Sequence, residues 1–566
     1  MRRKHKSIYI WLLAIVLASG MLWLGQYNER RLADENKINT TNTTNTNIPD
    51  TSSDTSDTEM PTEVPVVINP VLVPIGSVLP DAIIASGIDS TFGGFDTDTS
   101  AFTTVITDGG IKVLHYAPGT NANYSNWYLP GMGILESEIN RDTNGTTKLK
   151  EAAWTTEFSY RFYDKYVSLL KASGAKAFPS LNVSSQVAPG FGRFDQASID
   201  LATKDNLAMI ADMKSKGVAI MAVQLGVESY LSGYEDIFPT VENYIQRVKP
   251  IALAIKTAYP NIDIYIHPAP YDKSGKRLSE WNAALALQND FFDGTIIYSW
   301  LQVDPSCGGT VDQQFSCMNK VSKTFIDTTY PAQIAGTLAA FPGKKIAISQ
   351  YNIKLAGDYD TSSDNNTLYQ NTMFQAIHTA DFILGGVATY NAYHNNPVTA
   401  ATFMNMSGSD RNLISKFDKA SEDVGNVKET GGIVKRASWQ ALHLLEGLFD
   451  AKHHLLALTY TVQGSIPADV RVYGFTNGTQ QDLIIINRSG VALPLSSIKF
   501  TNGFDFGETS FTAEAMLANS LGATYGAKGD QNTTTSQIVL SGPSSYDSIA
   551  SVMIAPYSIV RIHIPN

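Results

Sequence analysis

The chain has 566 residues, of which 43% are hydrophobic and 17% are charged, so it is long enough for several domains of ordinary globular composition. Its net charge of −11 argues against binding to nucleic acid, whose phosphates select basic surfaces. The 26 Tyr, 24 Phe and 7 Trp are enough for a large core and for aromatic surfaces that stack on a ligand.

The N-terminus has the pattern of a membrane element. A basic tail, residues 1–6, precedes the uncharged run Ser7–Gly25. As a helix this run would be roughly 28 Å long, close to the thickness of a bilayer core. The basic tail predicts a cytoplasmic N-terminus and export of the rest. The run is therefore either a single-pass anchor, which places the chain at the cell surface, or a signal segment cleaved near Ala18–Gly20, which makes the protein secreted.

Residues 26–64 are rich in Asn, Thr and Ser and contain too few apolar residues to form a core. We expect this stretch to be a disordered stalk that separates the membrane from the globular part.

Short apolar strands alternate with amphipathic helices between Gly110 and Leu445. The predicted strands are Ile111–Tyr116, Ala175–Leu181, Ala219–Leu225, Ile262–His267, Gly294–Trp300, Lys345–Gln350 and Gly385–Tyr390. Helices are predicted between them, for example at Lys204–Lys216 and Val241–Ala258. This alternation predicts an α/β fold, with residues 65–445 forming a (β/α)8 TIM barrel. The alternative is an open doubly wound sheet, which usually has a Gly-rich phosphate loop near its start; the sequence has none there.

After a predicted helix at Ser438–Leu448, strands follow one another without helices. Val470–Phe475 and Leu483–Asn487 flank Asn477-Gly478, which is a strong hairpin signal. Residues 446–566 are therefore predicted to form an antiparallel β-sandwich domain. A strand from residues 66–75 could join it.

Two cysteines, Cys307 and Cys317, lie in the part predicted to be exported. A local disulfide is expected there, with two free thiols as the alternative. No metal site is predicted, because this region offers too few ligands.

Two predicted strands end in a polar side chain suited to catalysis. Met221–Tyr230 contains Glu228 after an apolar strand, and Lys344–Asn352 contains Gln350 in the same position. Barrel strands carry functional groups at their carboxyl ends, so both side chains are expected at one mouth. Desolvation after a buried strand would raise the pKa of the Glu228 carboxyl and make it a better proton donor. The alternative is an ordinary helix cap or surface glutamate.

Other polar and aromatic residues are predicted near this mouth, where they could bind or stack on a ligand; the alternative for each is core packing. They are His115, Trp127, Asn182, Tyr230, His267, Tyr298, Trp300, Tyr351, Asn352, Tyr390 and His394. Asp272, Asp293 and Asp304 are interpreted as turn or cap residues of loops near the mouth, with a catalytic base as the alternative.

These strand ends resemble motifs of the clan A glycoside hydrolases, in particular the α-L-arabinofuranosidase, β-xylosidase and heparanase-like families with a barrel and a C-terminal β-sandwich. The matching segments are Val113–Thr120 with Asn123–Trp127, Gln224–Tyr230, Phe292–Trp300, Ile348–Asn352 and Ser438–Leu445. The resemblance implies that Glu228 is the acid/base, that Gln350 occupies the nucleophile position and that the partner is a polysaccharide or oligosaccharide. No cofactor is predicted, and the sequence does not fix the oligomeric state.

Three positions depart from the family pattern. His115 replaces an Arg, Val227 replaces an Asn, and Gln350 replaces the nucleophilic Glu. A carboxamide cannot attack a sugar carbon as a carboxylate does, so the usual double displacement is expected to be absent. The preferred hypothesis is a glycan-binding pseudoenzyme. One alternative is an active hydrolase in which a 2-acetamido sugar supplies its own nucleophile, and a second is a structural surface or adhesion protein.

Overall fold

The structure is a computed structural model that describes residues 77–88, 99–116, 119–131, 133–134, 160–271, 273, 275–354, 368–404, 406, 413–416, 433–450, 452–463, 469–502, 510–525 and 537–565. The predicted basic tail, membrane segment, stalk and 66–75 strand lie outside these residues, as does Asp272. Within them, no helix combines the length and the apolar character that a membrane crossing requires.

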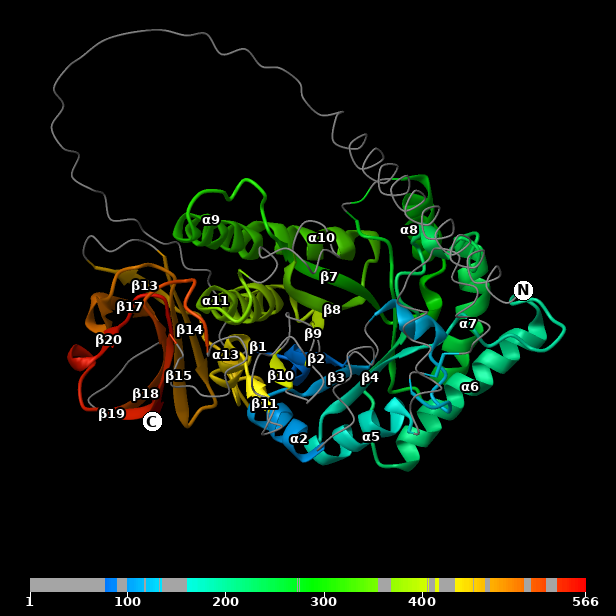
Figure 1. Cartoon of the computed structure of the whole chain (residues 1–566), viewed down its shortest axis with the longest axis horizontal. Helices are drawn as coiled ribbons and strands as arrows, with labels where there is room; N and C mark the ends of the chain where they lie inside the picture. Colours follow the sequence, from blue (N-terminus) through cyan, green and yellow to red (C-terminus); the bar gives the residue numbers. More distant parts are fainter. Residues whose placement is uncertain are drawn as a thin grey trace, which may run out of the picture. The chain divides into compact units, whose positions relative to one another are not determined.

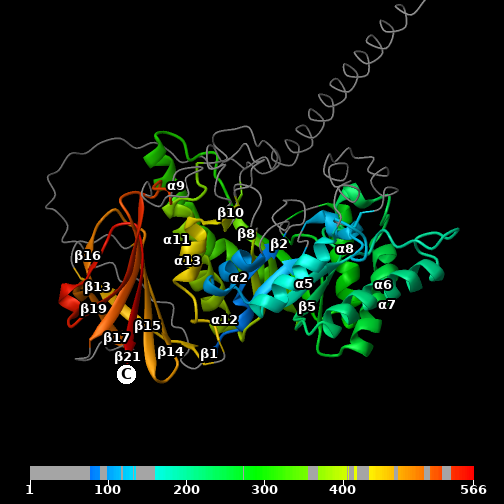
Figure 2. The same ribbon diagram turned by 60° about the horizontal axis from the view of Figure 1, so that its bottom comes forward.

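Eight parallel strands close into a barrel, which confirms the predicted TIM barrel (Figures 1 and 2). In order around the barrel they are β2 (Ile84–Ile88), β3 (Val113–Tyr116), β4 (Lys176–Leu181), β5 (Ala222–Leu225), β6 (Asp263–Ile266), β7 (Gly294–Gln302), β8 (Lys345–Lys354) and β9 (Val398–Phe403). β7 and β8 are the longest of these strands, and they pair along their whole length.

Helices surround the barrel and bury one apolar face against it. α7 (Val241–Ala258) illustrates this: Thr240 caps its N-terminus by accepting a hydrogen bond from the Asn243 N–H, and Val248, Ile251 and Ile255 lie on its buried side. The other main helices of this layer are α2 (Thr99–Asp108), α5 (Phe162–Ser173), α6 (Gln196–Ser215), α8 (Lys276–Leu287), α9 (Val311–Thr324), α10 (Tyr330–Ala340), α11 (Met373–Asp381) and α12 (Thr389–His394).

The prediction of a strand at Gly385–Tyr390 is wrong. This segment belongs to a helix that continues from α11 through a π-helical stretch, Phe382–Ala388, into α12. The apolar residues of this segment show no clear helical periodicity, because nearly all its side chains are buried. Position 385 requires glycine, because a Cβ there would collide with the Tyr473 hydroxyl of the C-terminal sheet. The true first and last barrel strands, β2 and β9, were not predicted.

The C-terminal part forms antiparallel sheets, which confirms the predicted β-sandwich. The large sheet has the order β1 (Ser77–Val78), β12 (His454–Leu455), β14 (Val470–Thr476), β15 (Gln480–Asn487), β21 (Ser558–Pro565), β18 (Phe511–Ala518) and β19 (Ile538–Tyr546). Two smaller sheets pair β13 (Thr459–Val462) with β17 (Ile498–Asn502) and β16 (Leu493–Pro494) with β20 (Met553–Ile554). An N-terminal segment, Ser77–Val78, joins the large sheet by pairing with β12.

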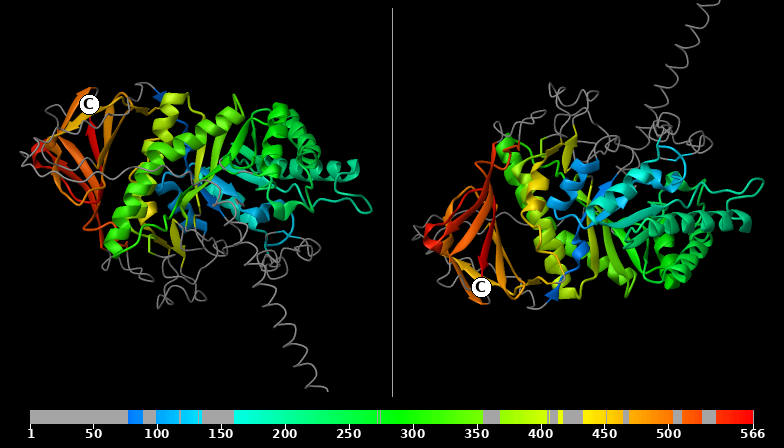
Figure 3. Two further views of the ribbon diagram at one scale, coloured as in Figure 1. Left: turned by 90° about the horizontal axis from the view of Figure 1, so that it is seen from above. Right: turned by 90° about the horizontal axis from the view of Figure 1, so that it is seen from below.

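Helices α9, α11 and α13 (Ala437–His443) lie between the barrel strands and the large sheet (Figures 1 and 3). One hydrophobic cluster includes Phe374 and Ile377 of α11 together with Ile484, Met516 and Ile559 of the sheet. The barrel and the large sheet therefore share a core.

A buried ionic cluster also joins these two parts. Asp381, at the end of α11, accepts hydrogen bonds from Arg488 and from the Tyr473 hydroxyl, the latter at 2.7 Å, and lies 3.4 Å from Arg471. Arg488 also donates to Asn319 of α9 at 3.0 Å. Asp381 and Arg488 are fully buried. We call these five residues the interface cluster.

Candidate active site at the barrel mouth

The barrel interior has an apolar floor. One residue from each strand contributes to it: Ala85, Val113, Phe178, Ala222, Tyr265, Ile296, Ala347 and Ala400. Because side chains in a strand alternate between faces, the residue two positions further along each strand also faces inward. These residues make the next layer toward the mouth.

This next layer is polar and uncharged, and we call it the polar ring. It consists of Gly87, His115, Ser180, Gln224, His267, Tyr298, Ser349 and Thr402. Burial lowers the pKa of His115 to about 3, and burial together with the nearby His115 lowers the pKa of His267 to about 3. Both imidazoles are therefore neutral at neutral pH, and the ring carries no formal charge.

Contacts between neighbouring members hold the polar ring together. The His115 ring stacks on Phe178 of the floor at 4.6 Å, and its Nε2 lies 3.1 Å from the Ser180 hydroxyl. Two buried hydroxyls of the ring, Ser349 Oγ and Thr402 Oγ1, have no hydrogen-bond partner among the described residues. Unpaired buried groups of this kind each cost about 1–3 kcal/mol, so the ring is not built for stability alone.

A β-bulge in β8 directs Gln350 into the barrel. Ile297 of β7 lies opposite Ile348, but the next residue, Tyr298, lies opposite Gln350, so β8 has one extra residue at Ser349. Ile348 and Tyr351 both pack outside the barrel, and the two residues between them, Ser349 and Gln350, face its interior. Bulges re-aim side chains in this way beside active sites.

Glu228 lies after β5 in a strained conformation. Its φ is 50°, in the left-handed region, where a residue with a Cβ is disfavoured by about 1–2 kcal/mol. Of the five described non-glycine residues with positive φ, three are asparagines, which tolerate this conformation better than glutamate does. Such strain persists only where the surrounding structure imposes it, and it is typical of functional sites.

Three elements impose this conformation on the Glu228 loop. The Asn123 side chain pairs with the backbone of Val227, accepting from its N–H and donating to its carbonyl, both at 2.7 Å. His267 Nδ1 accepts from the Glu228 N–H at 3.2 Å. The Arg277 guanidinium of α8 donates to the carbonyls of Tyr230, Ser229, Phe238 and Pro239. The loop is held from both sides.

Successive contacts connect Glu228 with Gln350. The Glu228 N–H binds His267, the His267 ring meets the Tyr298 ring edge-on at 4.7 Å, and Tyr298 lies opposite Gln350 across the β7–β8 pair. The two predicted strand ends therefore belong to one mouth.

Trp300 occupies the next inward position on β7, at the rim above Tyr298, and is partly exposed. The Lys354 ammonium lies 5.9 Å from the centre of its ring. This is the position expected of a residue that stacks on a ligand.

Other predicted binding residues lie elsewhere. Tyr351 is 1% exposed and packs on Phe382, outside the barrel. Asn352 uses its amide to bind the Met404 carbonyl and Gln375 of α11.

Asn182 and Trp127 serve local structure next to the mouth. The Asn182 amide accepts from the Ser184 and Ser185 N–H groups and donates to Ser185 Oγ. Trp127 donates to the Asp205 carbonyl at 3.2 Å and packs against α5 and α6. Tyr230 is buried edge-on against His267.

Tyr390 and His394 are not at strand ends, because the strand predicted for this region is helix α12. Their rings stack on each other at 4.1 Å. α12 leads directly into the start of β9, so both residues lie toward the amino-terminal end of the barrel, opposite the mouth.

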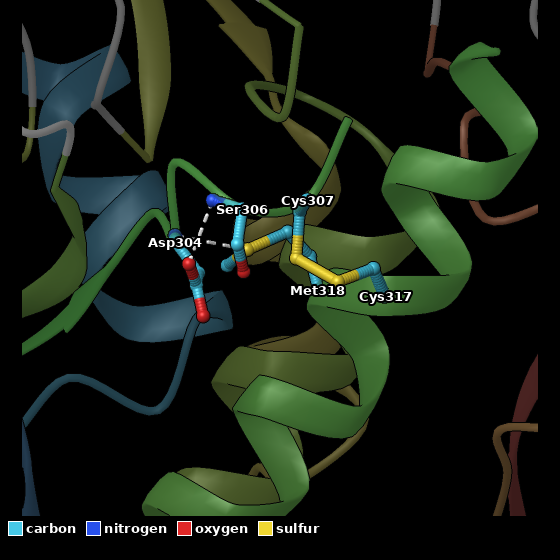
Figure 4. The surroundings of a disulfide bond; sticks show 5 residues. All are labelled: Asp304, Ser306, Cys307, Cys317 and Met318. Carbon is cyan, nitrogen blue, oxygen red and sulfur yellow. Dashed lines mark hydrogen bonds between the residues drawn. A yellow bond between two sulfur atoms is a disulfide. The ribbon is translucent and has the colours of Figure 1, made fainter. Parts of the chain in front are cut away.

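The loop aspartates have structural partners. Asp293 precedes β7, binds Lys256 at 2.8 Å and accepts from the Ile264 N–H, at the end of the barrel away from the mouth. Asp304 follows β7 and accepts from the Ser306 N–H at 2.8 Å (Figure 4). Hydrogen bonds from the side chain and the backbone of Ser306 lower the pKa of the Asp304 carboxyl. In this loop Cys307 is bonded to Cys317 of α9. The described residues contain no group of three or more His, Cys, Asp or Glu placed to hold a metal ion.

Comparison with solved structures finds the same architecture in glycosidases. The chain is similar to a family 51 α-L-arabinofuranosidase from Bifidobacterium longum, with a TM-score of 0.55 at 12% identity over 87% of this chain and 98% of that one. It is similar to an α-L-arabinofuranosidase from Thermotoga maritima, with 0.52 at 14% identity over 88% and 98%, and to a GH51 arabinofuranosidase from Xanthomonas axonopodis pv. citri, with 0.54 at 12% over 86% and 97%. The fold is that of the clan A glycoside hydrolases.

No protein-family model and no curated protein matches the sequence. At these identities the structural likeness establishes the clan A fold and not the activity.

Several site residues were not predicted from the sequence. Ser180, Gln224, Ser349 and Thr402 of the polar ring each follow a floor residue by two positions, so strand alternation could have found them. Arg277 has no comparable signal, because it acts on carbonyls about 40 residues away in the chain.

Proposed function

We propose that this chain is a glycosidase-like protein that holds an uncharged glycan at the barrel mouth and does not form a glycosyl–enzyme intermediate. The observation that carries this proposal is Gln350, turned into an uncharged polar ring where a retaining glycosidase needs a carboxylate. A carboxamide can hold a sugar by hydrogen bonds but does not attack its anomeric carbon.

The chemistry of the mouth favours a neutral sugar over an acidic one. The ring presents hydroxyl, amide and neutral imidazole groups, which pair with sugar hydroxyls as donors and acceptors. A carboxylated sugar would bring a charge against a polar ring that supplies no opposite charge, with the Lys354 ammonium only at the rim, which is costly. Trp300 at the rim adds an aromatic face for stacking.

The N-terminal sequence supports display outside the cell. The basic tail and the uncharged run Ser7–Gly25 fit a single-pass anchor with the C-terminal part outside, or a secreted protein if that run is cleaved. A cell-surface glycan would then be within reach of the mouth.

The second candidate is an active hydrolase that uses substrate assistance, and the strain at Glu228 favours it. A left-handed glutamate held by Asn123, His267 and Arg277 is more elaborate than passive binding requires. A 2-acetamido sugar could supply the nucleophile while Glu228 donates the proton and Gln350 orients the acetamido group.

Binding and turnover measured together separate the two candidates. Full-length protein in detergent micelles is titrated calorimetrically with arabino-, xylo-, cello- and chito-oligosaccharides, and release of reducing sugar is assayed in parallel. We expect saturable binding without turnover, about tenfold weaker in Trp300→Ala and unchanged in Tyr393→Ala, an exposed aromatic on α12.

The outcomes are distinct. Turnover that Glu228→Gln abolishes would establish the second candidate. Absence of binding to every neutral oligosaccharide would contradict both candidates and favour a purely structural surface protein.

A further inference from the structure

A pocket opens in the barrel wall beside the mouth, between strands β6 and β7 and helices α8 and α10, and we call it the side pocket. Pairing between β6 and β7 ends at Ile266 and Thr295, although β7 continues to Gln302. β6 cannot extend further because Pro268 and Pro270 follow it, and proline has no N–H for a strand ladder. The wall is therefore open beyond this point.

The surface of the side pocket is mostly apolar. Pro268, Pro270, Ile297 and Phe341 line it, and its volume, including the part open to solvent, is about 440 Å³. The Tyr271 ring forms an outer wall by lying against Gly336 of α10, where a Cβ would come within 2.6 Å of the ring. A larger residue at that position would displace the wall.

The polar side chains that line the pocket are already used to brace it. Asn282 binds both the N–H and the carbonyl of Ala269, each at 2.9 Å. Gln333 donates to the Tyr298 carbonyl at 2.5 Å and accepts from the Ser299 hydroxyl at 2.6 Å. These amides fix the open edge of β7 and leave the apolar surface to a ligand.

His267 adds one hydrogen-bond donor to this apolar surface. Its Nδ1 accepts from the Glu228 N–H, so the neutral ring must carry its proton on Nε2. His267 lines the side pocket and also belongs to the polar ring. It therefore connects the pocket with the mouth.

We propose that the side pocket takes an acetyl group carried by the bound glycan, as an O-acetyl ester or an N-acetyl amide. The methyl group lies against the prolines and Phe341, and the carbonyl oxygen accepts the His267 Nε2–H. A bare hydroxyl could accept the Nε2–H but would leave its own O–H without an acceptor among the apolar walls, and a pure hydrocarbon would leave the imidazole N–H unpaired. This inference rests on the proposed glycan binding.

Matched ligand pairs test the proposal. Full-length protein in detergent micelles is titrated with an O-acetylated xylo-oligosaccharide and its alkali-deacetylated form, and with chito- and cello-oligosaccharides of equal length. We expect at least one acetylated member to bind about tenfold more tightly than its partner. A preference within the first pair only identifies the ester as the natural group, and within the second pair only the amide.

Variants of α10 locate the effect. Ala340→Leu fills the side pocket, so it should abolish the acetyl preference while leaving binding of the deacetylated member unchanged. Ala339→Leu, exposed on the same helix, should retain the preference. Ala340→Val provides the same test if the leucine variant does not fold.

Two results would overturn the proposal in distinguishable ways. Equal affinity for both members of each pair would reject the acetyl group but leave glycan binding intact. Absence of binding to all four of these oligosaccharides and to arabino-oligosaccharides would instead reject the proposed function itself.

Discussion

The polar ring and the interface cluster are both buried and both rich in polar groups. Only in the interface cluster do all the charged groups have partners within the protein. In the interface cluster, the carboxylate of Asp381 faces two arginines and a tyrosine hydroxyl, and Arg488 has further partners on α9. In the polar ring, charges are absent and the Ser349 and Thr402 hydroxyls have no partner among the described residues.

This difference distinguishes structural polar groups from functional ones. Burying a charge is tolerable only when partners compensate its desolvation, as they do where the barrel meets the large sheet. The polar ring avoids charge and leaves hydrogen-bonding capacity unused, which a ligand with many hydroxyls can exploit. The predictions that follow test each side of this comparison.

The largest expected effect is acid unfolding driven by buried histidines in both regions. Burial lowers the pKa of His115, His267 and His378 to about 3 in the folded state, from 6.5. Below pH 6.5 the unfolded chain binds protons that the folded one does not, so the free energy of unfolding falls as the pH decreases toward 3. Each histidine contributes up to about 1.4 kcal/mol per pH unit.

Urea denaturation at pH 7, 6 and 5 measures this slope. His115→Gln, in the polar ring, and His378→Gln, beside the interface cluster, should each reduce it by about one proton. An unchanged slope in either variant would mean that the histidine is not held neutral by burial.

Breaking the interface cluster should have the next largest effect. Arg488→Ala leaves the fully buried Asp381 without its closest cation, and we expect a loss of about 3–5 kcal/mol in the free energy of unfolding. Lys276→Ala, which removes an exposed partner of Glu280, should cost less than about 1 kcal/mol. Equal losses in the two variants would show that the buried cluster has no special role.

The double variant Asp381→Leu with Arg488→Met sharpens this test. It removes both charges, so we expect it to cost less than the sum of the single substitutions, because neither charge is left unpaired.

Sequence patterns predicted the fold because the barrel and the sandwich depend on local periodicity. Strand alternation and the Asn477-Gly478 hairpin are visible in a few residues, and β14 and β15 pair as expected. The error at Gly385–Tyr390 arose where this signal fails, in a helix with nearly every side chain buried.

The site was predicted less completely, because its geometry depends on irregularities and long-range contacts. The bulge at Ser349 shifts the alternation of β8, so Gln350 faces the mouth and Tyr351 does not. The clamp of Asn123 on Val227 joins residues 104 positions apart. Local sequence gives no signal for either feature.

Placing a carboxyl group in the uncharged mouth should destabilise the protein moderately. Gln350→Glu buries an acid beside the polar ring, which has no cation, so its folded-state pKa should rise above the unfolded value. The variant should match the wild type near pH 4 and lose about 1–3 kcal/mol in the free energy of unfolding as the pH rises to 8.

Comparison of wild type and variant by urea denaturation at each pH removes the shared effect of the histidines. Gln463→Glu, exposed after β13, is the matched control and should change stability by less than about 0.5 kcal/mol. A variant as stable as the wild type at pH 8 would mean that a positive group compensates the acid, contrary to a neutral mouth.

The smallest expected effect is a gain in stability on relaxing the strain at Glu228. Glu228→Gly adopts the left-handed conformation without a Cβ, so the free energy of unfolding should rise by about 0.5–1 kcal/mol. Glu228→Gln keeps the strain and should leave stability unchanged, while both variants lose any function of the carboxyl. Urea denaturation at pH 7 measures the difference between the two variants. If the glycine variant is no more stable than the glutamine variant, the left-handed backbone at this position costs no free energy. The loop would then give no reason to regard Glu228 as more than a residue of the rim.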